Sequence, residues 1–156
     1  MSTPTPGGDP IVVGLDGSPQ SLKALRWAVG MAGLLGAPIN VVTAWQYPTT
    51  YGYASPLPDW NPEDDAREIQ ARAVAGVFGD DPPAGLAYVL QAGGAAAVLL
   101  TASETARMLV VGSRGHGGFA GLLLGSVSST VAEHASCPVL IVHGDQPALA
   151  LPGGAA

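Results

Sequence analysis

The chain has 156 residues, of which 47% are hydrophobic and 12% are charged. This length suits a single domain, and the composition is that of a globular protein with a generous core rather than a disordered or fibrous chain. Twelve acidic residues against six basic ones give a formal net charge of -6. Nucleic-acid binding relies on clustered lysine and arginine, so this balance argues against a nucleic-acid partner.

The chain contains no apolar run close to the roughly 20 residues that a membrane-spanning helix needs. Its first ten residues have neither the basic nor the hydrophobic part of a signal peptide. We therefore expect a cytoplasmic protein without membrane contact. The single cysteine, Cys137, excludes an internal disulfide and a cysteine-based zinc cage, and the three histidines are too scattered to predict a metal site.

Five apolar runs alternate with four helical patterns along the chain. Strands are expected at Ile11–Leu15, Ile39–Trp45, Ala87–Gln91, Met108–Val111 and Pro138–His143. Helices are expected from Pro19, with Ser18 as N-cap, to Leu35, from Pro62 to about Phe78, over about 95–104, and from near Ser126 to about His134. The alternation predicts an α/β fold, a single-domain open five-stranded parallel sheet with helices on both faces.

Both ends of the chain are rich in proline, glycine and other small residues. Such segments bury little apolar surface, so residues 1–9 and 144–156 are predicted to be disordered tails around a domain of residues 10–143.

The segment after the fourth expected strand, residues 112–125, contains six glycines in fourteen positions. Glycine allows the backbone to turn sharply and to approach a ligand closely. A helix that begins at Ser126 would add unpaired N–H groups, a partial positive charge and a capping hydroxyl. In open parallel sheets, ligands bind beyond the carboxyl ends of the strands, where the strand order reverses. These features together predict an anion site built from backbone N–H groups and hydroxyls.

Two other phosphate-binding motifs fit the loop poorly. No Gly-Lys-Ser/Thr sequence follows it, which excludes a Walker-type loop. The segment from Gly115 to Ala120 formally matches G-x-G-x-x-A. However, it follows the fourth strand rather than the first, and no acidic residue ends a strand about 20 positions later, so a dinucleotide site is not indicated.

The spacing Gly112-x2-Gly115-x9-Gly125-Ser126 resembles the ATP-binding signature of the universal stress protein family. The opening segment 11–18, Gly93 after the third strand and the segment 136–142 are also similar to that family, so the resemblance covers about residues 10–143. It implies a Rossmann-like fold of the adenine nucleotide alpha hydrolase type. Met108 departs from the family pattern, where an acidic residue is common, but this position lies outside the phosphate loop.

The resemblance also implies a set of ligand-contacting residues and a dimer. Adenosine would lie beside Gly14, Asp16 and Ala44, with the carboxylate near the ribose, and the base and sugar would be bordered by Val111 and Gly112. The phosphates would be surrounded by Gly115, Gly125, Ser126, Val127 and Ser128. Family members form homodimers, often through the last strand, here Val139–His143.

Several roles remain open at this point. Asp16 either contacts the ligand or only forms the turn before the first helix. Ser126 and Ser128 cap the last helix, contact phosphate, or do both, and Arg114 and His116 either reach phosphates or point to solvent. The aromatic residues Trp45 and Tyr47 either flank the base or pack, and the long loop 46–61 has the position of a lid.

Three functions are compatible with these residues. The first is an ATP-binding regulatory module in the stress response, because no catalytic group is evident beside the loop. The second is a slow ATPase on the same scaffold, with Mg²⁺ on the phosphates of ATP as an option. The third is a family member that holds AMP or cyclic AMP, or a structural dimer that holds no nucleotide.

Overall fold

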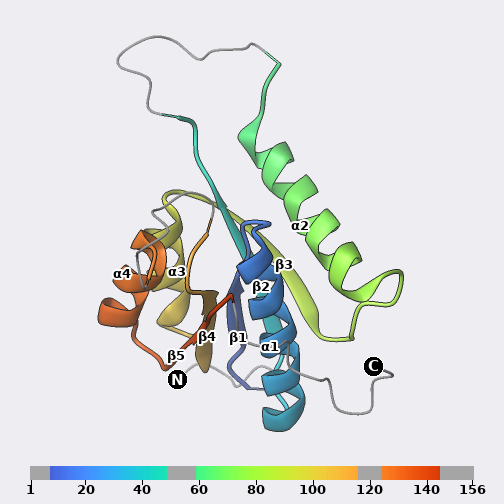
Figure 1. Cartoon of the computed structure of the whole chain (residues 1–156), viewed down its shortest axis with the longest axis vertical. Coiled ribbons are helices and arrows are strands. Elements are labelled where there is room, and N and C mark those ends of the chain that lie inside the picture. Colours follow the sequence, from blue (N-terminus) through green and yellow to red (C-terminus); the bar gives the residue numbers. More distant parts are fainter. Residues whose placement is uncertain (1–7, 49–58, 116–123, 145–156) are drawn as a thin grey trace.

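The computed structural model of the chain describes residues 8–48, 59–115 and 124–144. Most of both predicted tails, most of the loop 46–61 with Tyr51 and Tyr53, and His116 lie outside these residues, so the expectations for them stay predictions. The elements, drawn in Figure 1, are β1 (Ile11–Gly14), α1 (Pro19–Leu35), β2 (Ile39–Trp45), α2 (Pro62–Phe78), β3 (Leu86–Ala92), α3 (Ala95–Ser103), β4 (Met108–Gly112), α4 (Ser126–His134) and β5 (Val139–Val142).

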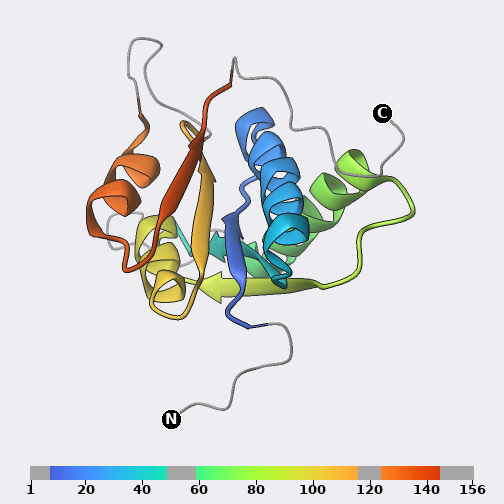
Figure 2. The ribbon, with the colours of Figure 1, turned by 90° about the horizontal axis from the view of Figure 1, so that it is seen from below.

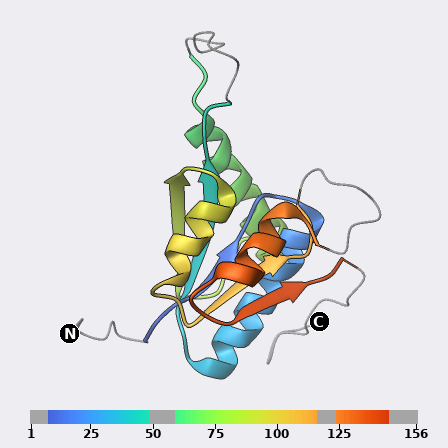
Figure 3. The same ribbon diagram turned by 90° about the vertical axis from the view of Figure 1, so that its left-hand side faces the viewer.

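The five strands form one parallel sheet in the order β3-β2-β1-β4-β5, which confirms the predicted fold class. Helices α1 and α2 cover one face, and α3 and α4 cover the other (Figures 1 and 2). The chain first proceeds outward from β1 to β3 and then crosses back to β4 and β5, which places β3 and β5 at opposite edges of the sheet (Figure 3). The strand order therefore reverses between β1 and β4, where a crevice is expected at the carboxyl ends.

The core consists of two apolar clusters, one on each face of the sheet. In β1, Ile11 and Val13 belong to the cluster under α1 and α2, whereas Val12 belongs to the cluster under α3 and α4. All three side chains are buried, because helices cover both faces. This double burial explains why β1 is a continuous apolar run rather than an alternating one.

The ends of α1 follow local sequence signals. The Ser18 side chain accepts a hydrogen bond from Ser21 N, and Pro19 is the first helical residue, as predicted. Gly36 ends the helix in the left-handed conformation, with φ of 63°. Strand boundaries differ from the expected ones by about one residue: β1 ends at Gly14 instead of Leu15, because the chain turns there toward α1.

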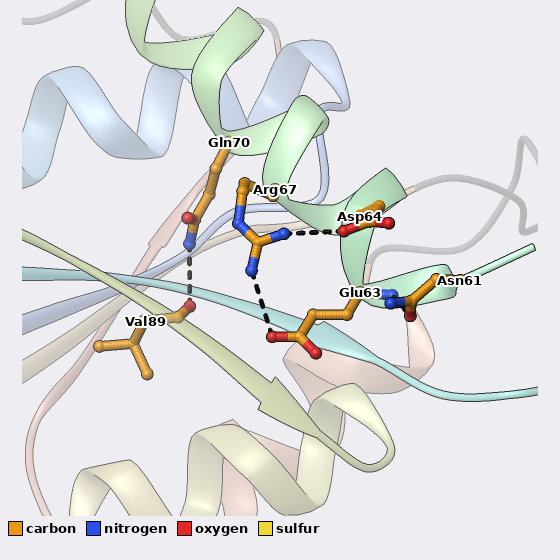
Figure 4. Close-up of polar contacts among 6 residues, drawn as sticks. All are labelled: Asn61, Glu63, Asp64, Arg67, Gln70 and Val89. Carbon is orange, nitrogen blue, oxygen red and sulfur yellow. Dashed lines mark hydrogen bonds and ion pairs between the residues drawn. The ribbon is translucent and has the colours of Figure 1, made fainter.

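Helix α2 is attached to the sheet by a buried glutamine (Figure 4). The Gln70 side-chain amide donates to Val89 O of β3 at 2.8 Å, which the figure shows. It also donates to Val41 O of the neighbouring strand β2 at 3.0 Å. On its exposed side, Arg67 pairs with Glu63 and Asp64. The buried contacts attach the middle of α2 to the middle of β2 and β3. None of the helices in the described ranges combines the length and the apolar character needed to cross a membrane.

Candidate functional site

A cleft of about 540 Å³ opens at the carboxyl ends of β1, β2 and β4, at the reversal of strand order. It is lined by all ten residues for which the family resemblance implied ligand contacts: Gly14, Asp16, Ala44, Val111, Gly112, Gly115, Gly125, Ser126, Val127 and Ser128. They come from four separate segments of the chain. The fold brings them together, and their contacts with a ligand stay a prediction.

The exit of β1 combines a tight contact with a polar turn. A Cβ at Gly14 would lie 3.0 Å from a methyl carbon of Leu99, so only glycine fits without rearrangement. Two residues later, Asp16 Oδ1 accepts from Ser18 N at 2.9 Å and from Ser18 Oγ at 2.5 Å. Asp16 therefore forms the turn before α1 and also lines the cleft, so the two roles considered for it are compatible.

Gly115 lies directly against the Asp16 carboxylate. A Cβ at this position would collide with Asp16 Oδ2. The φ angle of Gly115 is outside the left-handed region, so the backbone conformation itself does not require glycine. A larger residue at position 115 therefore fits only if the Asp16 carboxylate, which packs here on the loop after the fourth strand, turns away.

Ser113 joins the two ends of the glycine-rich loop. Its carbonyl oxygen accepts from Gly125 N at 2.7 Å and from Ser128 Oγ at 2.6 Å. Its own N–H donates to Val142 O of β5 at 2.8 Å. Because the single hydroxyl hydrogen of the buried Ser128 is used for Ser113, the only hydrogen-bond donor that Ser128 can offer a ligand is its backbone N–H.

The start of α4 differs from the prediction of a serine-capped helix. Gly125 is the N-cap, with an extended conformation (φ -75°, ψ 174°), Ser126 is the first helical residue, and no side chain caps the helix. Both residue types suit an N-cap, so the backbone path out of the loop decides which residue takes that position. The uncapped first turn presents N–H groups toward the cleft, an arrangement that favours an anion.

The opposite wall of the cleft was missed by sequence reasoning. It is formed by one face of the first two turns of α2, by Pro62, Asp65, Ala66 and Ile69. Their spacing of three or four residues is that of one helical face, and this was the available signal. Only the packing of α2 on the sheet shows that this face borders the cleft.

An aromatic cluster connects this wall with the end of β2. The rings of Trp45 and Tyr47 meet edge to face at 6.2 Å, and those of Tyr47 and Trp60 at 5.9 Å. The Trp60 indole N–H then donates to Asp65 Oδ2 at 2.8 Å. Packing is thus observed for both Trp45 and Tyr47, while Trp45 also lines the cleft.

The charges around the cleft are few. Asp16 and Asp65 are its carboxylates, and Arg114 is the one basic side chain among the described lining residues. No group of three metal-ligating side chains occurs in the parts of the chain that the structure describes. Outside the cleft, Cys137 is half-buried rather than fully buried, and burial raises the pKa of its thiol.

The sheet defines an α/β protein of the Rossmann-like class, and its cleft lies at the reversal of strand order. The model of the universal stress protein family matches residues 8–143. A universal stress protein of Mycolicibacterium smegmatis is 34% identical over 145 residues, which are 88% of this chain and 49% of the relative. One of Mycobacterium tuberculosis is 36% identical over 147 residues, 86% of this chain and 48% of the relative. The chain belongs to the universal stress protein family.

The chain spans about half the length of the curated relatives it matches. Among solved structures, a universal stress protein crystallised in complex with cAMP is 31% identical, with a TM-score of 0.60, over 88% of this chain and 98% of the other. The protein UspA from Lactobacillus plantarum has a TM-score of 0.68 at 18% identity, over 86% of this chain and 97% of the other, which shows the shared fold.

Proposed function

We propose that the protein binds ATP in this cleft and acts as a regulatory module whose nucleotide occupancy is read by a partner protein. The observation that carries the proposal is the meeting of the β4 exit with the uncapped start of α4. This junction offers an anion several backbone N–H groups and a partial positive charge at one end of a cleft large enough for a nucleotide.

The roles of the lining residues follow the cleft from one end to the other. Adenosine lies beside Gly14, Asp16 and Ala44, with Val111 and Gly112 along the base and sugar. The phosphates lie at the other end, near Gly115, Gly125, Ser126, Val127 and Ser128. Ser126 is exposed and contributes its hydroxyl, whereas Ser128 contributes its backbone N–H because its hydroxyl donates to Ser113 O.

The charge balance of the cleft supports binding of ATP with Mg²⁺ rather than of the free anion. Two carboxylates and one arginine line it, so the described side chains do not neutralise a triphosphate. A magnesium ion carried on the phosphates supplies that neutralisation. Removal of Mg²⁺ with a chelator is therefore expected to weaken ATP binding.

We propose binding rather than efficient turnover. Phosphoryl transfer requires stabilisation of charge and an oriented nucleophile. The described lining supplies Arg114 for the first requirement, and Asp16, the carboxylate beside the loop, already accepts two hydrogen bonds from Ser18. Slow hydrolysis is tested by following ADP over hours with Mg²⁺, and rapid ADP formation would contradict the regulatory proposal.

A second candidate ligand is a nucleotide with a single phosphate, AMP or cyclic AMP. The observation that favours it is the 31% identical relative whose crystal structure contains cAMP. The several N–H groups in the uncapped first turn of α4 favour the longer phosphate chain. Mass spectrometry of nucleotide released from freshly purified protein, and titration with ATP, AMP and cyclic AMP, distinguish these ligands.

Isothermal titration with ATP tests the site itself. The variant Gly115→Val introduces a side chain against Asp16 and is expected to lose binding. Ser126→Ala removes one exposed hydroxyl and is expected to bind a few-fold more weakly. Ser136→Ala, an exposed serine outside the cleft, is the matched control. Equal affinity of the wild type and Gly115→Val would sink the proposed site.

We further propose a homodimer through β5 in the cytoplasm. Strand β5 is an edge of the sheet, and Val139, Leu140 and Ile141 on it are only partly buried. Edge strands present backbone groups that pair readily with another strand. Light scattering on the full chain, with and without ATP, tests the dimer, and a monomer at all concentrations would contradict it. Cell fractionation tests the location.

A further inference from the structure

Gln20, in the first turn of α1, contacts the exit of β4. Its side-chain oxygen Oε1 accepts from Ser113 Oγ at 2.9 Å and from Arg114 N at 2.6 Å. Ser113 is 2% exposed, so the contact is shielded from water. Gln20 itself lies outside the set of residues that line the cleft, and it acts on a ligand only through the loop.

The position of this side chain is restricted by two glycines. A Cβ at Gly112 would lie 2.8 Å from Gln20 Cβ, and one at Gly144 would lie 2.9 Å from Gln20 Nε2. Gln20 therefore passes between the end of β4 and the chain that follows β5. One turn further along α1, Lys23 Nζ donates to Gly144 O, which ties the same segment to the helix.

The bond to Arg114 N determines how one peptide unit is oriented. In a trans peptide the N–H and the preceding C=O point in opposite directions. The structure has no cis peptide bond among its described residues. Since Arg114 N–H points to Gln20, Ser113 O points away from α1, toward α4. There it accepts the hydrogen bonds from Gly125 N and Ser128 Oγ.

We propose that Gln20 is a positioning residue for the phosphate end of the cleft. By holding the peptide between Ser113 and Arg114, it keeps Ser113 O in place to accept from Gly125 N and Ser128 Oγ. The first turn of α4 is thereby placed where its N–H groups face phosphate. The affinity for the phosphates then depends on Gln20, a side chain of α1 that is not part of the glycine signature. The affinity for adenosine is independent of Gln20. This inference rests on the proposed nucleotide binding.

The first experiment compares ATP with adenosine by isothermal titration. The variant Gln20→Met keeps the side-chain length and removes the acceptor, which leaves two shielded donors without a partner. ATP affinity is expected to fall roughly tenfold, the size expected for loss of such hydrogen bonds, while adenosine affinity stays within about twofold. Gln91→Met, at an exposed glutamine of β3 outside this cleft, is the matched control and is expected to change neither.

The second experiment needs no ligand. Hydrogen exchange of the Arg114 amide is expected to accelerate in Gln20→Met. In Gln20→Glu it is expected to return toward the wild-type rate, because a carboxylate oxygen also accepts from the amide. A general loss of stability would instead accelerate exchange throughout the core strands and would not be reversed by glutamate.

Two binding results overturn the inference: Gln20→Met binds ATP as tightly as the wild type does, or its affinities for ATP and for adenosine fall by the same factor. Unchanged exchange of the Arg114 amide in Gln20→Met also overturns it. Failure of the wild type to bind ATP or adenosine contradicts the proposed function instead, and the exchange measurement then still decides whether Gln20 orients the peptide.

Discussion

The two ends of the cleft are built in different ways. At the end formed by β4 and α4, the contacts involve mainly backbone groups around the buried Ser113, namely Gly125 N, Arg114 N and Ser113 O. At the end formed by β2 and α2, side chains contact one another, with the 53% exposed Tyr47 between two half-buried tryptophans. Substitutions at the first end should displace the backbone and have large effects on stability or ATP affinity. Substitutions at the second end should have small effects, because they alter only neighbouring side chains.

The largest effect is expected from Gly112→Val. The new Cβ would lie 2.8 Å from Gln20 Cβ and 3.0 Å from its backbone carbonyl carbon, which cannot move without shifting α1. Overpacking of this kind costs about 1–3 kcal/mol of unfolding free energy, and ATP binding should be lost. Denaturant unfolding measures the first effect and titration the second.

Gly33→Ala is the control for this variant. Gly33 is exposed in α1 with no atom near its missing Cβ, so alanine should leave the protein as stable or stabilise it by up to about 1 kcal/mol. If Gly112→Val is as stable as the wild type, the end of the cleft formed by β4 and α4 is less rigid than its contacts indicate.

A smaller effect on stability, but a clear one on binding, is expected from Gly115→Ala. Here the atom in the way is Asp16 Oδ2, the end of a side chain that can turn. ATP affinity should fall about tenfold, whereas the unfolding free energy should change by about 0.5 kcal/mol or less. Gly76→Ala, at an exposed glycine of α2, is the matched control.

A double-mutant cycle identifies the cause. If the collision with Asp16 is responsible, adding Gly115→Ala to Asp16→Ala should cost no further affinity. Full additivity of the two substitutions would mean that Gly115 is required by the ligand or by the loop rather than by Asp16.

At the end formed by β2 and α2, Asp65→Ala is expected to lower the affinities for ATP and for adenosine by the same small factor, roughly twofold to threefold. It removes the acceptor of the Trp60 indole, and it leaves the backbone of β4 and α4 unchanged. Asp64→Ala, which removes an exposed partner of Arg67 outside the cleft, is the control. A loss for ATP alone would contradict the assignment of this end to the nucleoside.

The smallest expected effect is a change in the alkylation rate of Cys137, which lies away from both ends of the cleft. Burial raises the pKa of its thiol above the ordinary value, so less thiolate is present at neutral pH than in an unfolded chain. The rate of alkylation should therefore be lower in the folded protein. It should also keep rising with pH in the range where the rate for the unfolded chain has already levelled off. Equal rates in the folded and unfolded chain at every pH would contradict this.

Much of the fold could be predicted because its signals are local. The Ser18-Pro19 start and the Gly36 end of α1 depend on capping chemistry within a few residues, and the apolar run of β1 reflects burial on both faces. The start of α4 was predicted less well. Glycine and serine at 125–126 both suit an N-cap, and the choice depends on the backbone path fixed by Ser113, twelve residues earlier in the chain.

By itself, the amino-acid sequence determined the α/β class and the glycine-rich loop after β4, because spacing and residue type carry that information. Its resemblance to the universal stress protein family implied ten of the residues that line the cleft. Only the tertiary structure decided the strand order, the wall formed by α2 and the contact of Gln20 with Arg114 N. These features join segments far apart in the chain. They depend on which surfaces pack together, and the periodicity of a single segment does not specify its partner.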